Sequence, residues 1–195
     1  MAEVERRSMG RVELRAASEG KPAQLVGYAA VFNSRSEDLG GFREIIMPGA
    51  FDRALEEGHD VRALVNHNED KMLGRTSSGT ARLAVDEKGL GVEIDIPDTQ
   101  AGRDTQVLVQ RGDLSQMSFA FQTLADQWRT EEGEPIRELL DLKLYDVSVV
   151  AFPAYPATEV SARALERARE AKAPPAVAPV ERLARQIRAF EREGS

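Results

Sequence analysis

The chain has 195 residues, of which 42% are hydrophobic and 30% are charged; it contains no cysteine, and its net charge is −7. This length and composition favour one domain with a sizeable core and additional segments at its ends. The lack of cysteine excludes disulfides, thiolate metal ligands and a cysteine nucleophile, and the acidic balance argues against a nucleic-acid partner.

The sequence has no apolar run of the length that a signal peptide or a membrane span requires. The lack of cysteine also fits a reducing compartment. We therefore expect a soluble intracellular protein without a membrane partner.

The first 67 residues predict short strands and one helix. Residues 1–10 are polar, and we expect them to be flexible. Residues 50–57 predict a helix that ends at Gly58. Gly27 predicts a bulge or a close approach of two backbones. Apolar and alternating segments predict strands at residues 12–16, 24–32, 42–47 and 61–67.

The middle of the chain predicts a hairpin followed by a helix. Polar residues at 68–72 predict a turn. Residues 74–85 and 90–97 alternate in polarity and predict the two strands of the hairpin. Residues 98–112 predict a helix that Asp98 or Thr99 caps and Gly112 closes.

Residues 112–121, GDLSQMSFAF, predict a turn that runs into a strand with one hydroxyl among apolar residues. Alternation with a period of two gives this strand one bulky face and one small or polar face. The bulky face carries Met117, Phe119 and Phe121, and the other face carries Ser118, Ala120 and Gln122. A lone serine in such a place is usually an ordinary residue of a half-buried strand. A catalytic role for Ser118 therefore needs support from the rest of the chain.

The last third of the chain predicts two return strands and a helical end. Residues 129–135 predict a turn, and residues 136–141 and 142–150 predict strands. In the second of these strands, Asp146 and Ser148 share a face with apolar residues. The remaining residues predict a loop with prolines, a helix, an extended linker and an amphipathic helix, at 151–156, 158–172, 173–179 and 180–193.

The chain has two histidines, which differ in their surroundings. His59 follows a helix in a polar turn, and we expect it to be solvated. His67 ends an apolar strand between Asn66 and Asn68. No pair of histidines has the spacing of metal ligands. We therefore predict no metal site and no cofactor.

Acyl transfer by a serine needs a base, a group that orients the base, and donors for the developing oxyanion. Ser118, His67 and Asp146 lie on three different predicted strands and could meet if these strands are neighbours in a barrel. The GxSxG and GDSGG signatures of two common serine hydrolase classes are absent. The residues alone therefore leave a serine hydrolase of another kind and a purely structural interpretation open.

Six motifs extend this interpretation through a resemblance. They are GYAAVFN (27–33), IIMPGAFDRAL (45–55), VRALVNHN (61–68), LGRT (73–76), GDLSQMSFAF (112–121) and LYDVSVVAFPAYPAT (144–158). In these motifs and in their order, the chain resembles the prohead protease family of tailed bacteriophages, whose members are similar to the herpesvirus assemblin protease.

The resemblance implies a mainly β (α+β) fold, in which a compact antiparallel β-barrel is surrounded by helices and followed by a C-terminal helical extension. We expect a flexible segment at 1–10, a protease domain at 11–160, and helices with a Pro/Ala linker at 161–195.

The same resemblance implies roles for individual residues. Ser118 would be the nucleophile and His67 the general base. Herpesvirus enzymes use a second histidine as the third member, but this chain has no histidine after His67. Asp146 occupies the position where the phage family usually has Glu, and a carboxylate can orient an imidazole. Glu138 and Asp141 are the alternative acids.

The resemblance implies a serine endopeptidase that cleaves a scaffolding segment of the capsid protein, or a scaffold protein, inside the prohead in the host cytoplasm. It also implies cleavage of the chain itself and a possible homodimer. Backbone N–H groups in residues 152–155 are candidate oxyanion donors. A non-catalytic scaffolding or capsid-assembly protein is the alternative, and it predicts that Ser118 and His67 lie apart. A small-molecule esterase is a third hypothesis, and it predicts a deep apolar pocket.

Overall fold

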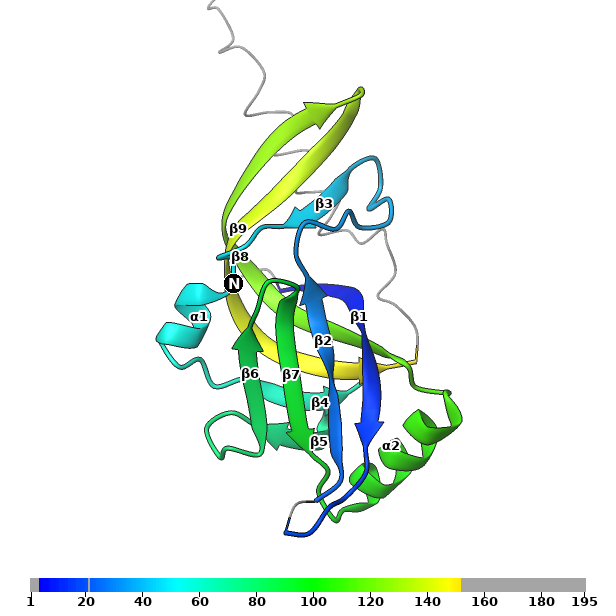
Figure 1. The fold of residues 1–195 in the computed structure, drawn as a ribbon. Coiled ribbons are helices and arrows are strands. Elements are labelled where there is room, and N and C mark those ends of the chain that lie inside the picture. The colour runs from blue at the N-terminus through cyan, green and yellow to red at the C-terminus, as the bar shows by residue number, and fades with distance from the viewer. Residues whose placement is uncertain (1–3, 21, 152–195) are drawn as a thin grey trace, which may run out of the picture.

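The computed structural model describes residues 4–20 and 22–151, and most of these residues lie in β-strands (Figure 1). Two short helices accompany the strands in this part of the chain. None of the described helices has the length and apolar character needed to cross a membrane. The elements are β1 (Glu5–Arg15), β2 (Gln24–Val31), β3 (Arg43–Ile46), α1 (Asp52–Glu56), β4 (Arg62–Val65), β5 (Asn68–Arg75), β6 (Ala81–Val85), β7 (Gly89–Asp95), α2 (Gln100–Arg111), β8 (Gln116–Glu131) and β9 (Glu134–Val150).

The strands form one sheet in the order β5-β4-β9-β8-β1-β2-β7-β6, and β3 pairs with β9 outside this path. The two ends of the sheet, β5 and β6, approach each other. The backbone N–H of Arg75, the last residue of β5, donates to Oγ1 of Thr80, which directly precedes β6, at 3.0 Å. A Cβ added to Gly74 would lie 2.9 Å from the carbonyl oxygen of Thr80, so this approach requires glycine. The sheet is therefore a nearly closed barrel, which confirms the predicted mainly β fold class.

The barrel encloses a core to which β8 contributes its bulky face. Met117, Phe119 and Phe121 are at most 1% exposed. The ring of Phe119 lies 5.6 Å from that of Phe51 in an edge-on contact and 4.9 Å from that of Phe121 in a stacked contact. Burying each of these side chains contributes about 1.5–3 kcal/mol to folding. This packing fixes which face of β8 points inward and leaves Ser118 on the other face.

Several predicted elements are confirmed with their boundaries nearly as expected. α2 begins after Thr99, whose side chain accepts a hydrogen bond from the backbone N–H of Gly102, and it ends at Gly112 with a φ of 82°. Strands β6 and β7 form the predicted hairpin. A Cβ on Gly27 would lie 2.1 Å from the carbonyl oxygen of Arg11, which confirms the predicted close approach of two backbones.

The N-terminal segment differs from its prediction. Residues 5–10, expected to be flexible, form the first half of β1 and pair with β8. The many charged side chains gave this segment the character of a solvated tail. Two of them, those of Glu5 and Arg7, instead point inward and form ion pairs. Arg7 contacts Glu44 at 2.7 Å and Glu5 at 2.8 Å, and Arg137 contacts Glu5 at 2.8 Å and Glu44 at 3.1 Å. All four side chains are at most 5% exposed.

The segment between β4 and β6 also differs from its prediction. The strand predicted at 61–67 ends at Val65, so His67 lies in a turn and not at the end of a strand. Residues 68–72, expected to form a turn, begin β5. The single strand predicted at 74–85 is divided between β5 and β6. The exposed edge strand β5 begins with polar residues, which gave its sequence the character of a turn.

The last two strands form a hairpin that is longer than the sequence suggested. β8 and β9 pair from Gln116–Val150 to Glu131–Glu134, so the turn predicted at 129–135 is limited to two residues, and the two predicted return strands are one. Polar residues at the far end of the hairpin gave its sequence the character of a turn. In the structure they form ion pairs across the two strands, such as Arg129 with Glu138 at 2.6 Å. Figure 1 shows the hairpin extending beyond the barrel. The elements predicted after Ala151, including the segment 161–195, lie outside the described residues.

Candidate active site

Ser118 lies on β8 in the middle of a row of three serines. It is paired in register with Ser8 of β1 and with Ser148 of β9. Directly paired residues of antiparallel strands point to the same side of the sheet, so the three hydroxyls share the face opposite the core. Neither Ser118 nor Ser148 has exposed surface.

His67 lies in the two-residue turn between β4 and β5. Asn66 and His67 have φ values of 51° and 55°, in the left-handed region that is uncommon for non-glycine residues but that asparagine and histidine adopt more often than most. The backbone N–H of Asn66 donates to the carbonyl oxygen of Val149 at 2.9 Å. The side-chain oxygen of Asn66 accepts from the backbone N–H of Ala151 at 3.2 Å. These bonds hold the turn against the end of β9.

The pairing of β4 with β9 brings this turn to the row of serines. The two strands are parallel, and Leu64 is in register with Ser148, while Val65 is in register with Val149. A turn that follows Val65 directly therefore lies above the part of β9 that carries Asp146 and Ser148. This pairing joins segments about 80 residues apart in the sequence, since Leu64 and Ser148 are its partners.

The structure brings the three predicted site residues together. His67 Nε2 lies 2.8 Å from Ser118 Oγ, and His67 Nδ1 lies 2.7 Å from Asp146 Oδ1. The side chains of His67 and Asp146 are each 12% exposed. An ionised carboxylate only accepts hydrogen bonds, so Nδ1 carries the proton in neutral His67 and Nε2 presents its lone pair to the hydroxyl of Ser118. This arrangement can move a proton from the hydroxyl to the imidazole.

The two alternative acids lie elsewhere on β9 and do not contact His67. Asp141 pairs with Arg53 at 2.9 Å, and Glu138 pairs with Arg129 at 2.6 Å. Along an extended strand, Asp141 is roughly 16 Å and Glu138 roughly 26 Å from Asp146. Of the three candidate acids, Asp146 is therefore the one that contacts His67.

Ser148 is a site residue that the sequence analysis did not propose. Its Oγ lies 2.8 Å from Asp146 Oδ1 and 3.2 Å from His67 Nδ1. The backbone N–H of His67 donates to the same oxygen at 3.2 Å. The sequence contained a signal that could have identified Ser148 as a site residue. Ser148 follows Asp146 by two residues on the same strand and so shares its face.

His59 is not part of this cluster, and its environment differs from the prediction. Its side chain is only 16% exposed, although we expected it to be solvated. Its Nε2 lies 3.1 Å from Glu57 Oε2, and its backbone N–H donates to the carbonyl oxygen of Ala54 at 3.0 Å. These contacts belong to the end of α1.

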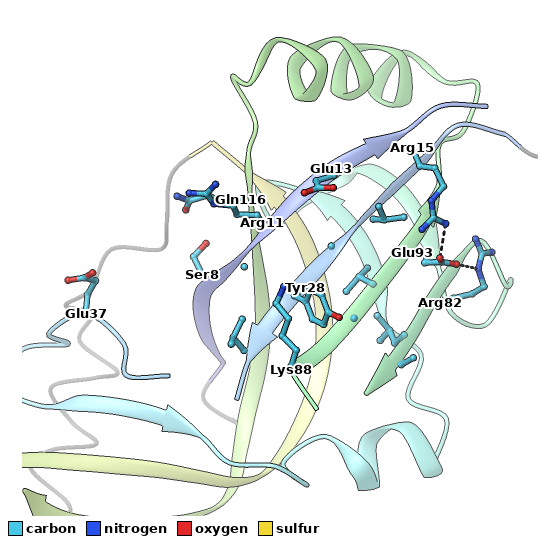
Figure 2. A pocket seen from close by; sticks show the side chains of 18 residues that line it. Ser8, Arg11, Glu13, Arg15, Tyr28, Glu37, Arg82, Lys88, Glu93 and Gln116 are labelled. Atoms are coloured by element: carbon cyan, nitrogen blue, oxygen red, sulfur yellow. Dashed lines mark hydrogen bonds and ion pairs between the residues drawn. The ribbon is translucent and has the colours of Figure 1, made fainter. Parts of the chain in front are cut away.

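An open hollow with a volume of about 960 Å³ lies over the outer face of β1, β2, β7 and β6 (Figure 2). Ser8 and Gln116, which are neighbours of Ser118 on β1 and β8, lie at one end of it. The other end carries Glu93 between Arg15 and Arg82. An open surface with this many charges differs from the deep apolar pocket that the esterase hypothesis predicts. The candidate oxyanion donors at 152–155 lie outside the described residues.

Comparison with known proteins identifies the family. The family model of the caudovirus prohead serine proteases matches residues 10–172. Among solved structures, the chain is similar to the bacteriophage T4 capsid assembly protease gp21, with a TM-score of 0.55 and 10% sequence identity over 76% of this chain and 97% of the other. A search of curated proteins found no match. Because the family model covers most of the sequence, the chain belongs to the caudovirus prohead serine protease family.

Proposed function

We propose that this protein is a serine endopeptidase of capsid maturation in which Ser118 is the nucleophile, His67 the general base and Asp146 the group that orients His67. The observation that carries the proposal is the continuous chain of hydrogen bonds from Ser118 through His67 to Asp146, with distances of 2.8 and 2.7 Å. These are the distances that proton transfer to a general base requires.

The proposed mechanism has two halves. Ser118 Oγ attacks the carbonyl carbon of the peptide bond while its proton passes to His67 Nε2, and Asp146 stabilises the imidazolium that forms. The tetrahedral intermediate collapses when His67 gives the proton to the leaving amine, which leaves an acyl group on Ser118. A water molecule, deprotonated by His67, then attacks the acyl group and restores the free hydroxyl.

The burial of Ser118 adds a requirement to this mechanism. Ser118 has no exposed surface, and the imidazole of His67 lies against its hydroxyl. A peptide carbonyl must approach Oγ to about 3–3.5 Å before attack. Binding of the substrate is therefore accompanied by a local rearrangement that uncovers Ser118.

The proposed substrates are the scaffolding segment of the capsid protein, or a separate scaffold protein, and the chain itself. Membership of the prohead protease family supports this choice, as does the similarity in fold to a capsid assembly protease. The open hollow beside Ser8 and Gln116 can accommodate an extended peptide. The protein would act inside the immature capsid in the host cytoplasm, and a homodimer stays a prediction from the family.

The test is expression of the chain together with the capsid and scaffold proteins of the same phage, followed by mass spectrometry of all products. We expect specific cleavage with the unchanged chain and none with the Ser118→Ala or His67→Ala variant. His59→Ala is the matched control, because this variant removes the other histidine, and its products should equal those of the unchanged chain.

Identical products from the unchanged chain and from Ser118→Ala would contradict the proposal. That result would favour the alternative of a non-catalytic scaffolding protein. Labelling with a fluorophosphonate, which reacts with activated serines, gives a second measurement that needs no knowledge of the substrate. The unchanged chain should be labelled at Ser118 and the His67→Ala variant should not.

A further inference from the structure

The hydroxyl of Ser148 contacts both His67, the proposed base, and Asp146, the group that orients this base. Ser148 Oγ lies 2.8 Å from Asp146 Oδ1, 3.2 Å from His67 Nδ1 and 3.2 Å from the backbone nitrogen of His67. Ser148 has no exposed surface, so water does not compete for these bonds. One oxygen therefore connects the carboxylate, the imidazole and the backbone of the turn.

The hydrogen-bonding capacity of a hydroxyl fits this environment completely. A serine hydroxyl has one proton to donate and two lone pairs. The proton is donated to the Asp146 carboxylate, which can only accept. One lone pair accepts from the backbone N–H of His67, and the other faces the Nδ1–H of His67 at the longer distance of 3.2 Å. Alanine and valine lack this combination of donor and acceptors, whereas threonine keeps it.

The bond to the backbone of His67 has a further consequence, because this residue lies in an uncommon conformation. Its φ of 55° is strained for a non-glycine residue and persists only where the surroundings hold the backbone in place. The hydroxyl of Ser148 is the acceptor for the backbone N–H of His67 in this turn. The same oxygen thus holds the backbone and the ring of His67.

We propose that Ser148 is a positioning residue of the active site, which fixes His67 in its turn and holds the Asp146 carboxylate against Nδ1. This inference rests on the proposed function, since it assigns a task that matters only if His67 is the base for Ser118. Ser148 does not touch the reacting atoms, and its nearest contact to them is through the His67 ring.

The measurement is the rate of fluorophosphonate labelling as a function of reagent concentration. We expect Ser148→Ala to lower the maximal rate about 10- to 100-fold, because a misplaced base transfers the proton poorly. The concentration for half-maximal rate should change little. Ser148→Thr and Ser148→Val add nearly the same volume to a buried site, but only Thr keeps the hydroxyl. The maximal rate of the Thr variant should therefore be close to that of the unchanged chain, and the maximal rate of the Val variant should be as low as that of Ser148→Ala. Thr105→Val is the control, because it removes another buried hydroxyl, which donates to the carbonyl oxygen of Ala101.

The outcomes separate the two proposals. If Ser118→Ala is still labelled at the full rate, the proposed function fails. If Ser118→Ala is not labelled but Ser148→Ala and Ser148→Val react like the unchanged chain, the function stands and the task of Ser148 is refuted. Slower labelling of Ser148→Ala and Ser148→Val, with Ser148→Thr close to the unchanged chain, supports it.

Discussion

At the scale of single residues, Asp146 has the most sharply defined task in the proposed mechanism. Its Oδ1 accepts hydrogen bonds from the imidazole of His67 and from the hydroxyl of Ser148. Both bonds require an acceptor at this oxygen, and both become weaker if the group is neutral. The carboxylate therefore selects the form of His67 that has its proton on Nδ1 and a free lone pair on Nε2.

We expect Asp146→Asn to keep the fold and to lower the rate of fluorophosphonate labelling by about 10²–10⁴-fold. An amide has nearly the same shape, but its NH₂ group can donate to Nδ1 and so places the proton on Nε2, where it blocks proton transfer from Ser118. Asp141→Asn is the matched control on the same strand, because Asp141 pairs with Arg53 far from the site. Equal labelling of both variants would exclude Asp146 from the mechanism.

At the scale of elements, the turn between β4 and β5 determines where the base lies. Asn66 and His67 both have positive φ, and two residues of this kind form the tight turn that suits the twist of a hairpin. Asparagine adopts this conformation more easily than most residues, and its side chain also accepts from the N–H of Ala151. Asn66 thus gives the turn both its conformation and a contact with the end of β9.

Substitutions at Asn66 separate these two contributions. Asn66→Gly keeps the conformation and loses the contact, whereas Asn66→Val loses the contact and adds the strain of a β-branched residue at positive φ. We expect Asn66→Val to be less stable than Asn66→Gly by about 1–2 kcal/mol in urea unfolding. The Val variant should also be labelled more slowly at Ser118, because a distorted turn moves His67. Equal stability and equal labelling of the two variants would show that the turn conformation does not matter.

The sequence predicted part of this site for a clear physical reason. Alternation along β8 and β9 depends only on neighbouring residues, so the face of Ser118 and the face of Asp146 followed from the pattern. The position of His67 did not, because Asn-His is a weaker signal for a tight turn than Asn-Gly. The parallel pairing of β4 with β9 is a long-range contact, and no local pattern specifies which strands become neighbours.

At the scale of the whole molecule, a buried ionic cluster joins parts of the barrel that are distant in sequence. Glu5 and Arg7 on β1, Glu44 on β3 and Arg137 on β9 contact one another at 2.7–3.1 Å. The sequence did not predict that the strand begins at Glu5, because a segment with charged residues at positions of both faces resembles a solvated segment. The cluster connects the N-terminal strand to the long hairpin that carries Ser118 and Asp146, so its stability bears on the site.

Glu5 gives this cluster a defined dependence on pH. Burial alone would raise the pKa of Glu5, but the charges of Arg137 and Arg7 and the hydrogen bonds from Arg137 and Thr123 outweigh it and lower the pKa below its ordinary value. A carboxylate with a lowered pKa in the folded state contributes stability above its unfolded pKa of about 4.3, and this contribution is lost as the pH falls through the folded value. The protein should therefore lose stability progressively below about pH 4.

We expect Glu5→Gln to lower the free energy of unfolding by about 3–5 kcal/mol at pH 7, because the change leaves two buried arginines with less compensating charge. The variant should also lose less stability than the unchanged chain between pH 5 and pH 3, since the titrating group is gone. Urea unfolding at several pH values measures both effects.

Glu13→Gln is the matched control, because Glu13 lies on the same strand but is exposed, and it should change the stability by less than about 0.5 kcal/mol. If Glu5→Gln is as stable as the control and follows the same pH dependence, the ionic cluster does not hold the N-terminal strand to the hairpin.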